Sequence, residues 1–250
     1  MGDRVRAAVD EADDAILSGA LEAAGHPRIG DEIAPGVRLV DDAAAALGGA
    51  DVAIDFTLPR VTCAVVRVAA ERGVAYVCGT TGLSASDRAE LEAAAQRIPI
   101  VLAPNFSVAV NVLAHLVGEA TRLLGPSYDV EIVELHHGAK RDAPSGTALR
   151  LAEAVADARG EELRKRLVAS RDGETGARPA QAIGVQALRG GDNPGEHTVL
   201  FLGRGERLEL IHRAATRDHF AVGALRAARW LRGRAPGLYT MQQVLGLETG

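Results

Sequence analysis

Short β-rich runs alternate with amphipathic helical stretches through the first half of this 250-residue chain. This alternation is typical of a parallel sheet whose strands are joined by crossover helices. The capping-box spacing of Ser84 and Asp87 marks the start of one such helix. The predicted strands cover residues 15–21, 37–40, 52–56, 75–78 and 100–102, and the predicted helices cover 61–72 and 87–97.

The second half has longer alternating strands joined by glycine-rich turns, which predicts an open mixed or antiparallel sheet. A helix at 110–124 leads into this region, whose strands are expected at 130–136, 182–188, 197–201 and 207–212. The polar stretch 162–181 predicts a long loop. Helices are expected at 220–231 and 238–245. The fold class is therefore α/β, with a Rossmann-like domain over 1–107 and 217–250 and an α+β domain over 108–216.

Composition excludes several classes of protein. Apolar residues make up 47% of the chain and aromatic residues 3%, so the core is built mainly from Ala, Val and Leu. A net charge of -5 argues against a protein that coats nucleic acid or anionic membrane. No apolar run approaches the roughly 20 residues that span a bilayer. Cys63 and Cys78 lack metal or redox spacing, which predicts core cysteines in a cytoplasmic protein.

The segment 130–147 combines acid-base groups with an anion pocket. An apolar strand ends in His136 and His137, and Lys140 follows within four residues of His136. The turn Pro144-Ser145-Gly146-Thr147 then opens a helix, whose first N–H groups can hold a carboxylate or phosphate. A neutral imidazole beside an ammonium can move protons. The segment therefore predicts a negatively charged substrate that accepts a proton.

Neighbouring histidines in a strand point to opposite faces, which argues against a shared metal ion. One catalytic and one substrate-holding histidine is the simpler arrangement. A purely structural alternative has one histidine bonded to a backbone carbonyl and Lys140 solvated. A further alternative is a hydrolase using Ser145, a histidine and Asp142, but no Gly-x-Ser-x-Gly elbow surrounds Ser145, which favours helix capping.

Ligands of doubly wound sheets lie beyond the carboxyl ends of the strands. Small or polar residues follow several of the predicted strands, and these are Glu22, Phe56-Thr57, Gly79-Thr80-Thr81-Gly82 and Ala103-Pro104-Asn105-Phe106. The glycine-threonine turn offers backbone donors at close range. An amide at Asn105 suits a nicotinamide carboxamide, and the Phe106 ring could pack beside it. Together these clusters favour a nucleotide site.

A dinucleotide fold also carries a Gly-x-Gly-x-x-Gly turn, with an acid about 20 residues later for the ribose hydroxyls. Glu22 suits that acid, and the same spacing counted back reaches Gly2. Because Met1-Gly2-Asp3-Arg4 reads as the start of a helix, the first strand and most of the phosphate loop are missing from the sequence as written. We expect translation to begin upstream.

The motifs Ile54-Asp-Phe-Thr57, Gly79-Thr-Thr-Gly82, Ala103-Pro-Asn-Phe-Ser107, Glu134-Leu-His-His137, Lys140 and Asp142-Ala-Pro-Ser-Gly-Thr147 resemble the 4-hydroxy-tetrahydrodipicolinate reductase family. The segment from Gly190-Gly-Asp to Gly195-Glu-His197 supports this resemblance, which runs through Leu247. It implies a cytoplasmic homotetramer that uses NADH or NADPH to reduce a cyclic dicarboxylate in lysine (diaminopimelate) biosynthesis. The Rossmann-like domain would then bind the dinucleotide. The α+β domain would bind the substrate and form the contacts with the other subunits.

The resemblance implies that His136 is the proton donor and acceptor and that Lys140 is a proton donor. It also implies that His137, Gly146 and Thr147 bind the substrate. The implied cofactor contacts are Glu22, Gly79, Thr80, Thr81, Ala103, Pro104, Asn105 and Phe106. Leu58 replaces a basic residue of the family pattern, while His26 and Arg28 could receive a 2′-phosphate, so NADH and NADPH both stay open. The alternative function is a cofactor-poor dicarboxylate-binding or scaffolding homologue, which would bind a pyridine dicarboxylate but not NADH.

Overall fold

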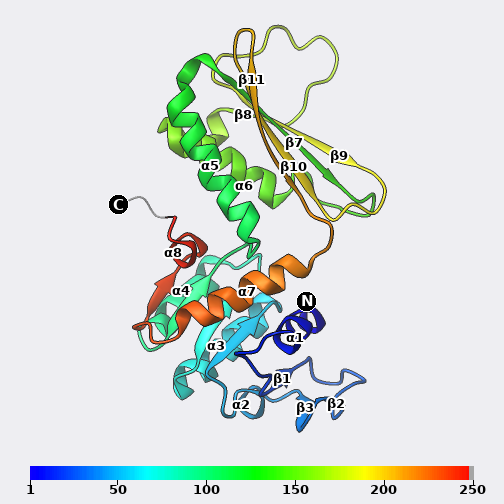
Figure 1. Ribbon diagram of the computed structural model, residues 1–250, viewed down its shortest axis with the longest axis vertical. Helices are drawn as coiled ribbons and strands as arrows, with labels where there is room; N and C mark the ends of the chain where they lie inside the picture. Colours follow the sequence, from blue (N-terminus) through cyan, green and yellow to red (C-terminus); the bar gives the residue numbers. More distant parts are fainter. Residues whose placement is uncertain (248–250) are drawn as a thin grey trace. The chain divides into compact units, whose positions relative to one another are not determined.

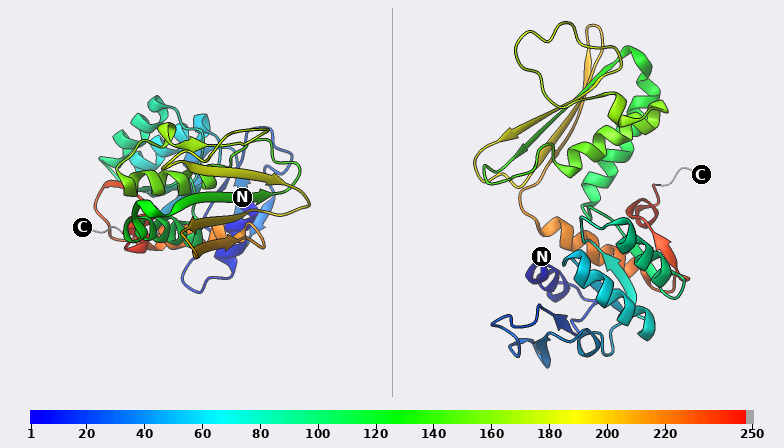
Figure 2. Two further views of the ribbon diagram at one scale, coloured as in Figure 1. Left: turned by 90° about the horizontal axis from the view of Figure 1, so that it is seen from above. Right: turned by 180° about the vertical axis from the view of Figure 1, so that it is seen from behind.

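The computed structural model describes residues 1–247, which form two compact units (Figures 1 and 2). Unit 1 comprises Met1–Ser107 together with the segment from Asp218 onward, and unit 2 comprises Val108–Arg217. Within the described part of the chain, no helix is both long and apolar enough to cross a bilayer.

Unit 1 contains a parallel sheet with helices on both faces. The strand order is β12 (Gly237–Tyr239), β6 (Pro99–Leu102), β5 (Ala75–Cys78) and β4 (Val52–Asp55). Helices α3 (Pro59–Arg72) and α4 (Ala85–Ala95) cover one face, and α7 (Asp218–Leu231) covers the other. Successive residues of a strand point to opposite faces, so Tyr76 and Cys78 enter one core and Val77 enters the other. The predicted parallel sheet and the Ser84–Asp87 capping box are confirmed.

A separate sheet of unit 1 has the order β1 (Ala20–Leu21), β3 (Val37–Val40) and β2 (Glu32–Ala34). Helix α1 (Gly2–Asp10) packs on α7, and α2 (Ala43–Ala46) follows β3. The predicted strand 15–21 is wrong except for its last two residues. Only these two pair with β3, whereas Ile16 is 89% exposed. No ladder joins β1 to β4 within residues 1–247, so the expected single sheet is divided.

Unit 2 is an open mixed sheet, as the sequence predicts, and it has two helices on one face (Figure 1). Its strand order is β11 (Arg207–Arg213), β10 (Glu196–Leu202), β7 (Asp129–His136), β9 (Ile183–Arg189) and β8 (Leu167–Val168). Strand β7 runs parallel to β9 and antiparallel to β10. Helices α5 (Val108–Leu124) and α6 (Gly146–Arg159) pack together beneath these strands, with short 3₁₀ turns at η1 (Gly125–Ser127) and η2 (Leu163–Lys165).

Two further predictions need correction. The region 162–181 is not entirely loop, because it contains η2 and the edge strand β8. The remainder is held by charge, since Arg171 and Arg178 both donate to the Glu131 carboxylate. The predicted helix 238–245 is strand β12 followed by the short helix α8 (Met241–Leu245). Pairing of β12 with β6 extends the first residues, and the Thr240 capping box starts the helix after them.

A buried carboxylate fixes the carboxyl end of β4. Asp55 accepts hydrogen bonds from Thr57 N (2.7 Å), Thr62 Oγ1 (2.6 Å) and Tyr76 OH (2.7 Å). Burial, followed by the nearby Asp55 carboxylate, raises the pKa of Tyr76 well above its ordinary value. Thr62 Oγ1 also lies 2.7 Å from Thr80 Oγ1, so this network ties together the turns after β4 and β5.

We predict that Asp55→Ala destabilises unit 1 by about 3 kcal/mol, because buried donors lose their acceptor. Urea unfolding followed by fluorescence of Trp230, the single tryptophan of the chain, measures this loss. Asp51→Ala removes an exposed carboxylate just before the same strand and should leave the midpoint almost unchanged. Equal midpoints for the two variants would refute the role given to Asp55.

Candidate active site

The carboxyl end of β7 separates the two adjacent histidines. Val130, Ile132, Glu134 and His136 occupy alternate positions of this strand and are all buried. His137 lies one residue beyond the strand, is half-buried, and donates its backbone N–H to Asn193 O (2.8 Å). The two rings therefore lie in different surroundings, with His136 the more enclosed.

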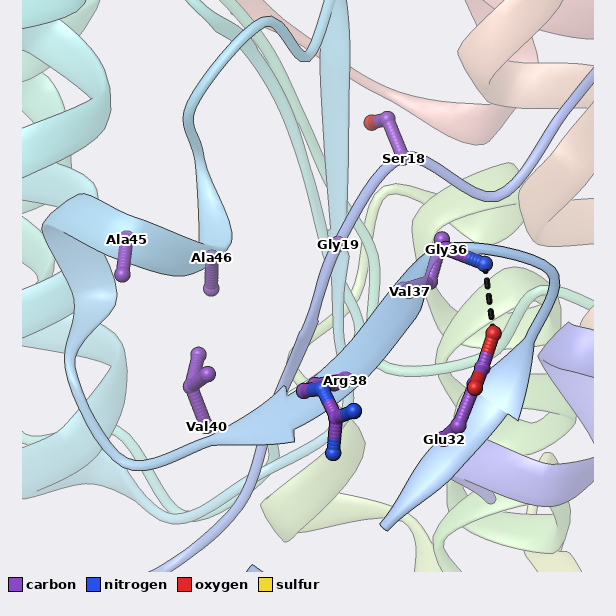
Figure 3. A pocket seen from close by; sticks show the side chains of 9 residues that line it. All are labelled: Ser18, Gly19, Glu32, Gly36, Val37, Arg38, Val40, Ala45 and Ala46. Atoms are coloured by element: carbon purple, nitrogen blue, oxygen red, sulfur yellow. Dashed lines mark hydrogen bonds between the residues drawn. The ribbon is translucent and has the colours of Figure 1, made fainter. Parts of the chain in front are cut away.

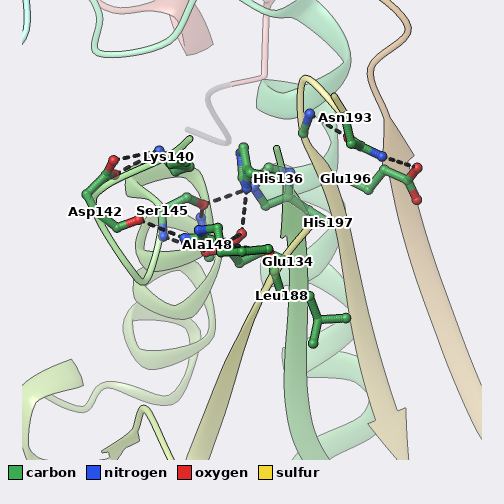
Figure 4. A network of polar contacts seen from close by, with 12 residues as sticks. Glu134, His136, Lys140, Asp142, Ser145, Ala148, Leu188, Asn193, Glu196 and His197 are labelled. Atoms are coloured by element: carbon green, nitrogen blue, oxygen red, sulfur yellow. Dashed lines mark hydrogen bonds and ion pairs between the residues drawn. The ribbon is translucent and has the colours of Figure 1, made fainter. Parts of the chain in front are cut away.

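Glu134 is the centre of a buried polar network (Figure 4). Its Oε2 lies 2.5 Å from His136 Nδ1, and its Oε1 accepts from Ser145 N (3.0 Å). Arg189 donates to both carboxylate oxygens, at 2.7 and 2.9 Å. Burial by itself would raise the pKa of Glu134, but the hydrogen bonds from Arg189, His136 and Ser145 outweigh burial and lower it. The carboxyl group is therefore ionised at neutral pH.

Lys140 lies in the loop that follows the paired histidines. Its ammonium donates to both oxygens of Asp142, at 2.9 and 2.8 Å (Figure 4). The hydrogen bond from Lys140 lowers the pKa of Asp142. The lysine side chain is 19% exposed and that of Asp142 is 64% exposed. This pair is thus partly open to solvent, which lets a substrate carboxylate compete with Asp142 for the ammonium.

The predicted turn begins α6, as the capping geometry shows. Ser145 is the N-cap, and its Oγ accepts from Ala148 N (3.1 Å). The same Oγ lies 3.1 Å from Nε2 of the buried His197. Burial, followed by the nearby His136 and His212, lowers the pKa of His197 to about 4. A neutral His197 therefore helps to hold the serine that caps the helix.

The predicted substrate residues come together in unit 2. Gly146 and Thr147 form the first turn of α6, where Gly146 is exposed and Thr147 half-buried. The positive end of the helix dipole lies at such a turn. Through Glu134, this turn and His136 share one carboxylate. Lys140 N donates to His137 O (3.1 Å), which places the lysine loop beside the same strand end.

The predicted cofactor residues all lie in unit 1, after β1, β5 and β6. Glu22, Thr81 and Pro104 are exposed, whereas Gly79 and Asn105 are half-buried. The side chains of Thr80, Ala103 and Phe106 are buried. The Phe106 ring packs edge-on against Phe56, with centroids 5.7 Å apart, so it belongs to the core.

Gly79 owes its identity to packing, because a Cβ there would lie 2.3 Å from the Phe56 ring. Asn105 Oδ1 accepts from Ser107 N (2.8 Å), which orients its amide. The parallel register brings the ends of β4, β5 and β6 to one edge of the sheet. Small and polar groups at this edge fit an extended nucleotide cofactor. Glu22 follows β1 of the separate three-stranded sheet, and its carboxylate has the chemistry to bind ribose hydroxyls.

A cavity of about 320 Å³ also lies in unit 1, near the amino ends of β1 and β3 (Figure 3). Its two charged wall groups are bonded internally, since Glu32 accepts from Gly36 N (2.8 Å) and Arg38 donates to Gly30 O (2.8 Å). The residues that line it are Ser18, Gly19, Glu32, Gly36, Val37, Arg38, Val40, Ala45 and Ala46. None of them is a predicted site residue.

Sequence reasoning missed Glu134, Arg189 and His197 as members of the site. The alternation of β7 could have revealed Glu134, since a charged residue at a core-facing position is unusual. Arg189 pairs with His136 in the register of β9, and His197 pairs with Glu134 in the register of β10. These long-range pairings leave no local pattern in the sequence.

We predict that Gly195→Ala displaces the His136 imidazole. A Cβ at residue 195 would lie 2.9 Å from His136 Nε2, and the φ of +150° strains any other residue. The ring cannot retreat freely because Glu134 holds its other nitrogen. Histidine ring signals in NMR spectra should show the change for His136. Gly190→Ala, which meets no atom within 4 Å, is the control; if both spectra matched the wild type, the close approach would be disproved.

Comparison with protein families identifies relatives over nearly the whole chain. Residues 1–106 match the family described as dihydrodipicolinate reductase, N-terminus, and residues 109–245 match dihydrodipicolinate reductase, C-terminus. A 4-hydroxy-tetrahydrodipicolinate reductase from Anaeromyxobacter dehalogenans (strain 2CP-C) is 52% identical over 94% of this chain and 89% of its own length. The protein of that name from Myxococcus xanthus (strain DK1622) is 49% identical over 98% of this chain and 93% of its own.

A solved structure supports the fold. Dipicolinate-bound dihydrodipicolinate reductase from Paenisporosarcina sp. TG-14 aligns with a TM-score of 0.79 and 24% identity, covering 97% of this chain and 94% of the other. An amine dehydrogenase from Mycobacterium smegmatis aligns with a TM-score of 0.58 and 17% identity, covering 96% and 92%. Family matches in both units and identities near 50% agree with the site motifs, and the chain therefore belongs to the dihydrodipicolinate reductase family of oxidoreductases.

Proposed function

We propose that this protein reduces 4-hydroxy-tetrahydrodipicolinate to tetrahydrodipicolinate, in the diaminopimelate route to lysine. The observation that carries the proposal is the convergence of His136, the Lys140 loop and the first turn of α6 at the end of β7. Relatives with the reductase name span nearly the full chain. They favour catalysis over the cofactor-poor binding homologue.

In this function His136 acts as proton donor and acceptor, and Lys140 acts as a proton donor. The buried imidazole has one nitrogen against Glu134 and the other beside Gly195, which has no side chain to cover it. Lys140 is charged and partly exposed, so its ammonium can leave Asp142 for a group of the substrate. General acid-base catalysis of this kind contributes about 10²- to 10⁴-fold to a rate.

His137, Gly146 and Thr147 bind the substrate carboxylates. The first turn of α6 presents N–H groups, and a carboxylate there is stabilised by the helix dipole. The buried Ser145 cap fixes the direction of those groups, because its hydroxyl is bonded to Ala148 N and lies against His197. A doubly charged ring suits this combination of helix amides and lysine.

The reductant is NADH or NADPH, held by unit 1, and the bound nicotinamide supplies the hydride. Glu22 would accept hydrogen bonds from ribose hydroxyls, and the exposed Thr81 and the Gly79 turn would help to hold the cofactor. Asn105, with Ala103 and Pro104, would hold the nicotinamide carboxamide. Thr80 and Phe106 contribute through their backbone, since their side chains are buried. The buried free thiols of Cys63 and Cys78 fit a cytoplasmic enzyme.

We further propose a homotetramer assembled through the uncovered face of the unit 2 sheet. The helices cover only one face of this sheet (Figure 2). On the other face Leu188 is 51% exposed and Ile211 is 44% exposed, beside the half-buried Val133, Leu135 and Leu200. Figure 4 shows Leu188 projecting away from the polar network. An apolar surface of this kind marks an interface.

Lys140→Met tests the catalytic assignment. We expect kcat to fall about 10²- to 10⁴-fold, because the proton donor is lost, with little change in melting temperature. Substrate-dependent oxidation of NADPH measures the rate. Lys165→Met removes an exposed lysine that pairs with Glu162 and should retain full activity. A fully active Lys140→Met enzyme would remove this lysine from the mechanism.

Leu188→Asp combined with Ile211→Asp tests the assembly. The wild-type protein should have the mass of a tetramer in light scattering, and the double variant should dissociate because buried charges are costly. Leu123→Asp changes an 83% exposed leucine on α5 and should keep the tetramer. A tetrameric double variant would show that this sheet face is not the interface.

A further inference from the structure

We propose that Glu134 is a positioning residue that fixes the protonated nitrogen of His136 and orients the substrate-binding turn at the same time. This inference rests on the proposed role of His136 in proton exchange. It explains why a charged residue occupies a fully buried position of β7, where the neighbouring inward residues are Val130 and Ile132.

The tautomer follows from the chemistry of the partners. An ionised carboxylate only accepts hydrogen bonds, so the contact between Glu134 Oε2 and His136 Nδ1 (2.5 Å) requires a proton on Nδ1. In the neutral ring Nε2 then carries the lone pair. Nε2 lies beside Gly195, where a Cβ would approach to 2.9 Å, so this nitrogen is left uncovered for the reaction. Nε2 is therefore the atom that exchanges the proton.

Arg189 keeps Glu134 ionised in this buried place. Its guanidinium contacts both carboxylate oxygens and also donates to Asp142 O (2.7 Å), so it connects β9 to the lysine loop. The pair has no net charge. His136 therefore gains a hydrogen-bond acceptor without the full field of an unpaired anion.

The second oxygen of Glu134 couples the imidazole to the helix start. Oε1 accepts from Ser145 N, the residue that caps α6. All the partners of Glu134 are thus donors: His136 Nδ1, Ser145 N and two nitrogens of Arg189. Glutamine cannot replace it, because one end of its amide is itself a donor.

Several charged or titratable groups face His136. Glu134 shares its strand, Arg189 comes from β9, and Lys140 and Asp142 come from the loop. His197 of β10 packs edge-on against it, with ring centroids 5.2 Å apart, and His212 of β11 lies behind His197. His197 is neutral at pH 7, so Glu134 and Arg189 are the charges whose removal should act most directly on the ring.

Two variants should act in opposite directions on the pH profile of kcat/KM. Glu134→Gln leaves the positive Arg189 beside the ring, which makes protonation of His136 harder and moves its limb of the profile to lower pH. Arg189→Gln leaves an unpaired carboxylate and moves that limb to higher pH. Glu134→Gln should also lower kcat by about 10²-fold or more, because the imidazole of His136 no longer favours the tautomer with its proton on Nδ1. The KM for NADPH should not change, since the cofactor residues lie in unit 1.

Nitrogen-15 NMR of the imidazoles tests the tautomer without any reference to activity, with His136 assigned from the spectrum of His136→Gln. In the wild type Nδ1 should carry the proton and Nε2 should not, and Glu134→Gln should lose this preference. A wild-type ring protonated on Nε2 would overturn the proposal, as would a folded Glu134→Gln protein with unchanged tautomer and pH profile. Activity retained in His136→Gln would instead refute the proposed role of His136.

Glu161→Gln is the matched control, because Glu161 also binds an arginine, Arg166, through both oxygens (3.0 and 2.7 Å). It lies beyond the far end of α6, roughly 20 Å from Ser145 by the rise of a helix. In Glu161→Gln the tautomer of His136 and the pH profile of kcat/KM should stay those of the wild type. If Glu161→Gln showed the changes expected for Glu134→Gln, that result would count against a specific role of Glu134. Should Glu134→Gln fail to fold, two other measurements decide the proposal. They are the tautomer in the wild-type spectrum and the pH profile of Arg189→Gln, which changes a half-exposed residue.

Discussion

The structure of the candidate active site depends on one buried carboxylate that is surrounded by hydrogen-bond donors. Glu134 has no exposed side-chain surface, yet Arg189, His136 and Ser145 together keep it ionised against the cost of burial. An unpaired charge in this position would be strongly unfavourable, so the three partners must be brought together by folding. Once they are, the imidazole, the lysine loop and the start of α6 are fixed relative to one another, because each is bonded to Glu134 or to Arg189.

The two units hold the polar residues of their candidate binding sites in different ways. In unit 1, strands β5 and β6 are buried on both faces, and the polar residues appear only where the strands end. In unit 2, helices cover one face of the sheet, and the inward positions of β7 carry Glu134 and His136. The first arrangement suits an extended cofactor along a sheet edge, and the second suits a small charged substrate.

The sequence predicted the elements whose pattern is local. Alternation of strands and helices, the Ser84 capping box and the turn before α6 were all found in the structure close to their expected positions. The errors occurred where pairing between distant segments decided the outcome. Residues 237–239 became a strand because β6 offered them an edge, and residues 15–19 remained outside the sheet because only Ala20 and Leu21 of the segment 15–21 pair with β3.

The sequence by itself determined the family, the strand that ends in two histidines, and the serine that caps the helix after it, because each of these is written in neighbouring residues. The tertiary structure alone decided that Arg189 and His197, more than 50 residues beyond Glu134, complete the network around that carboxylate. The reason is physical: the register of a sheet is set by side-chain packing and hydrogen bonding across strands, and a strand carries no local mark of the residue that will lie opposite.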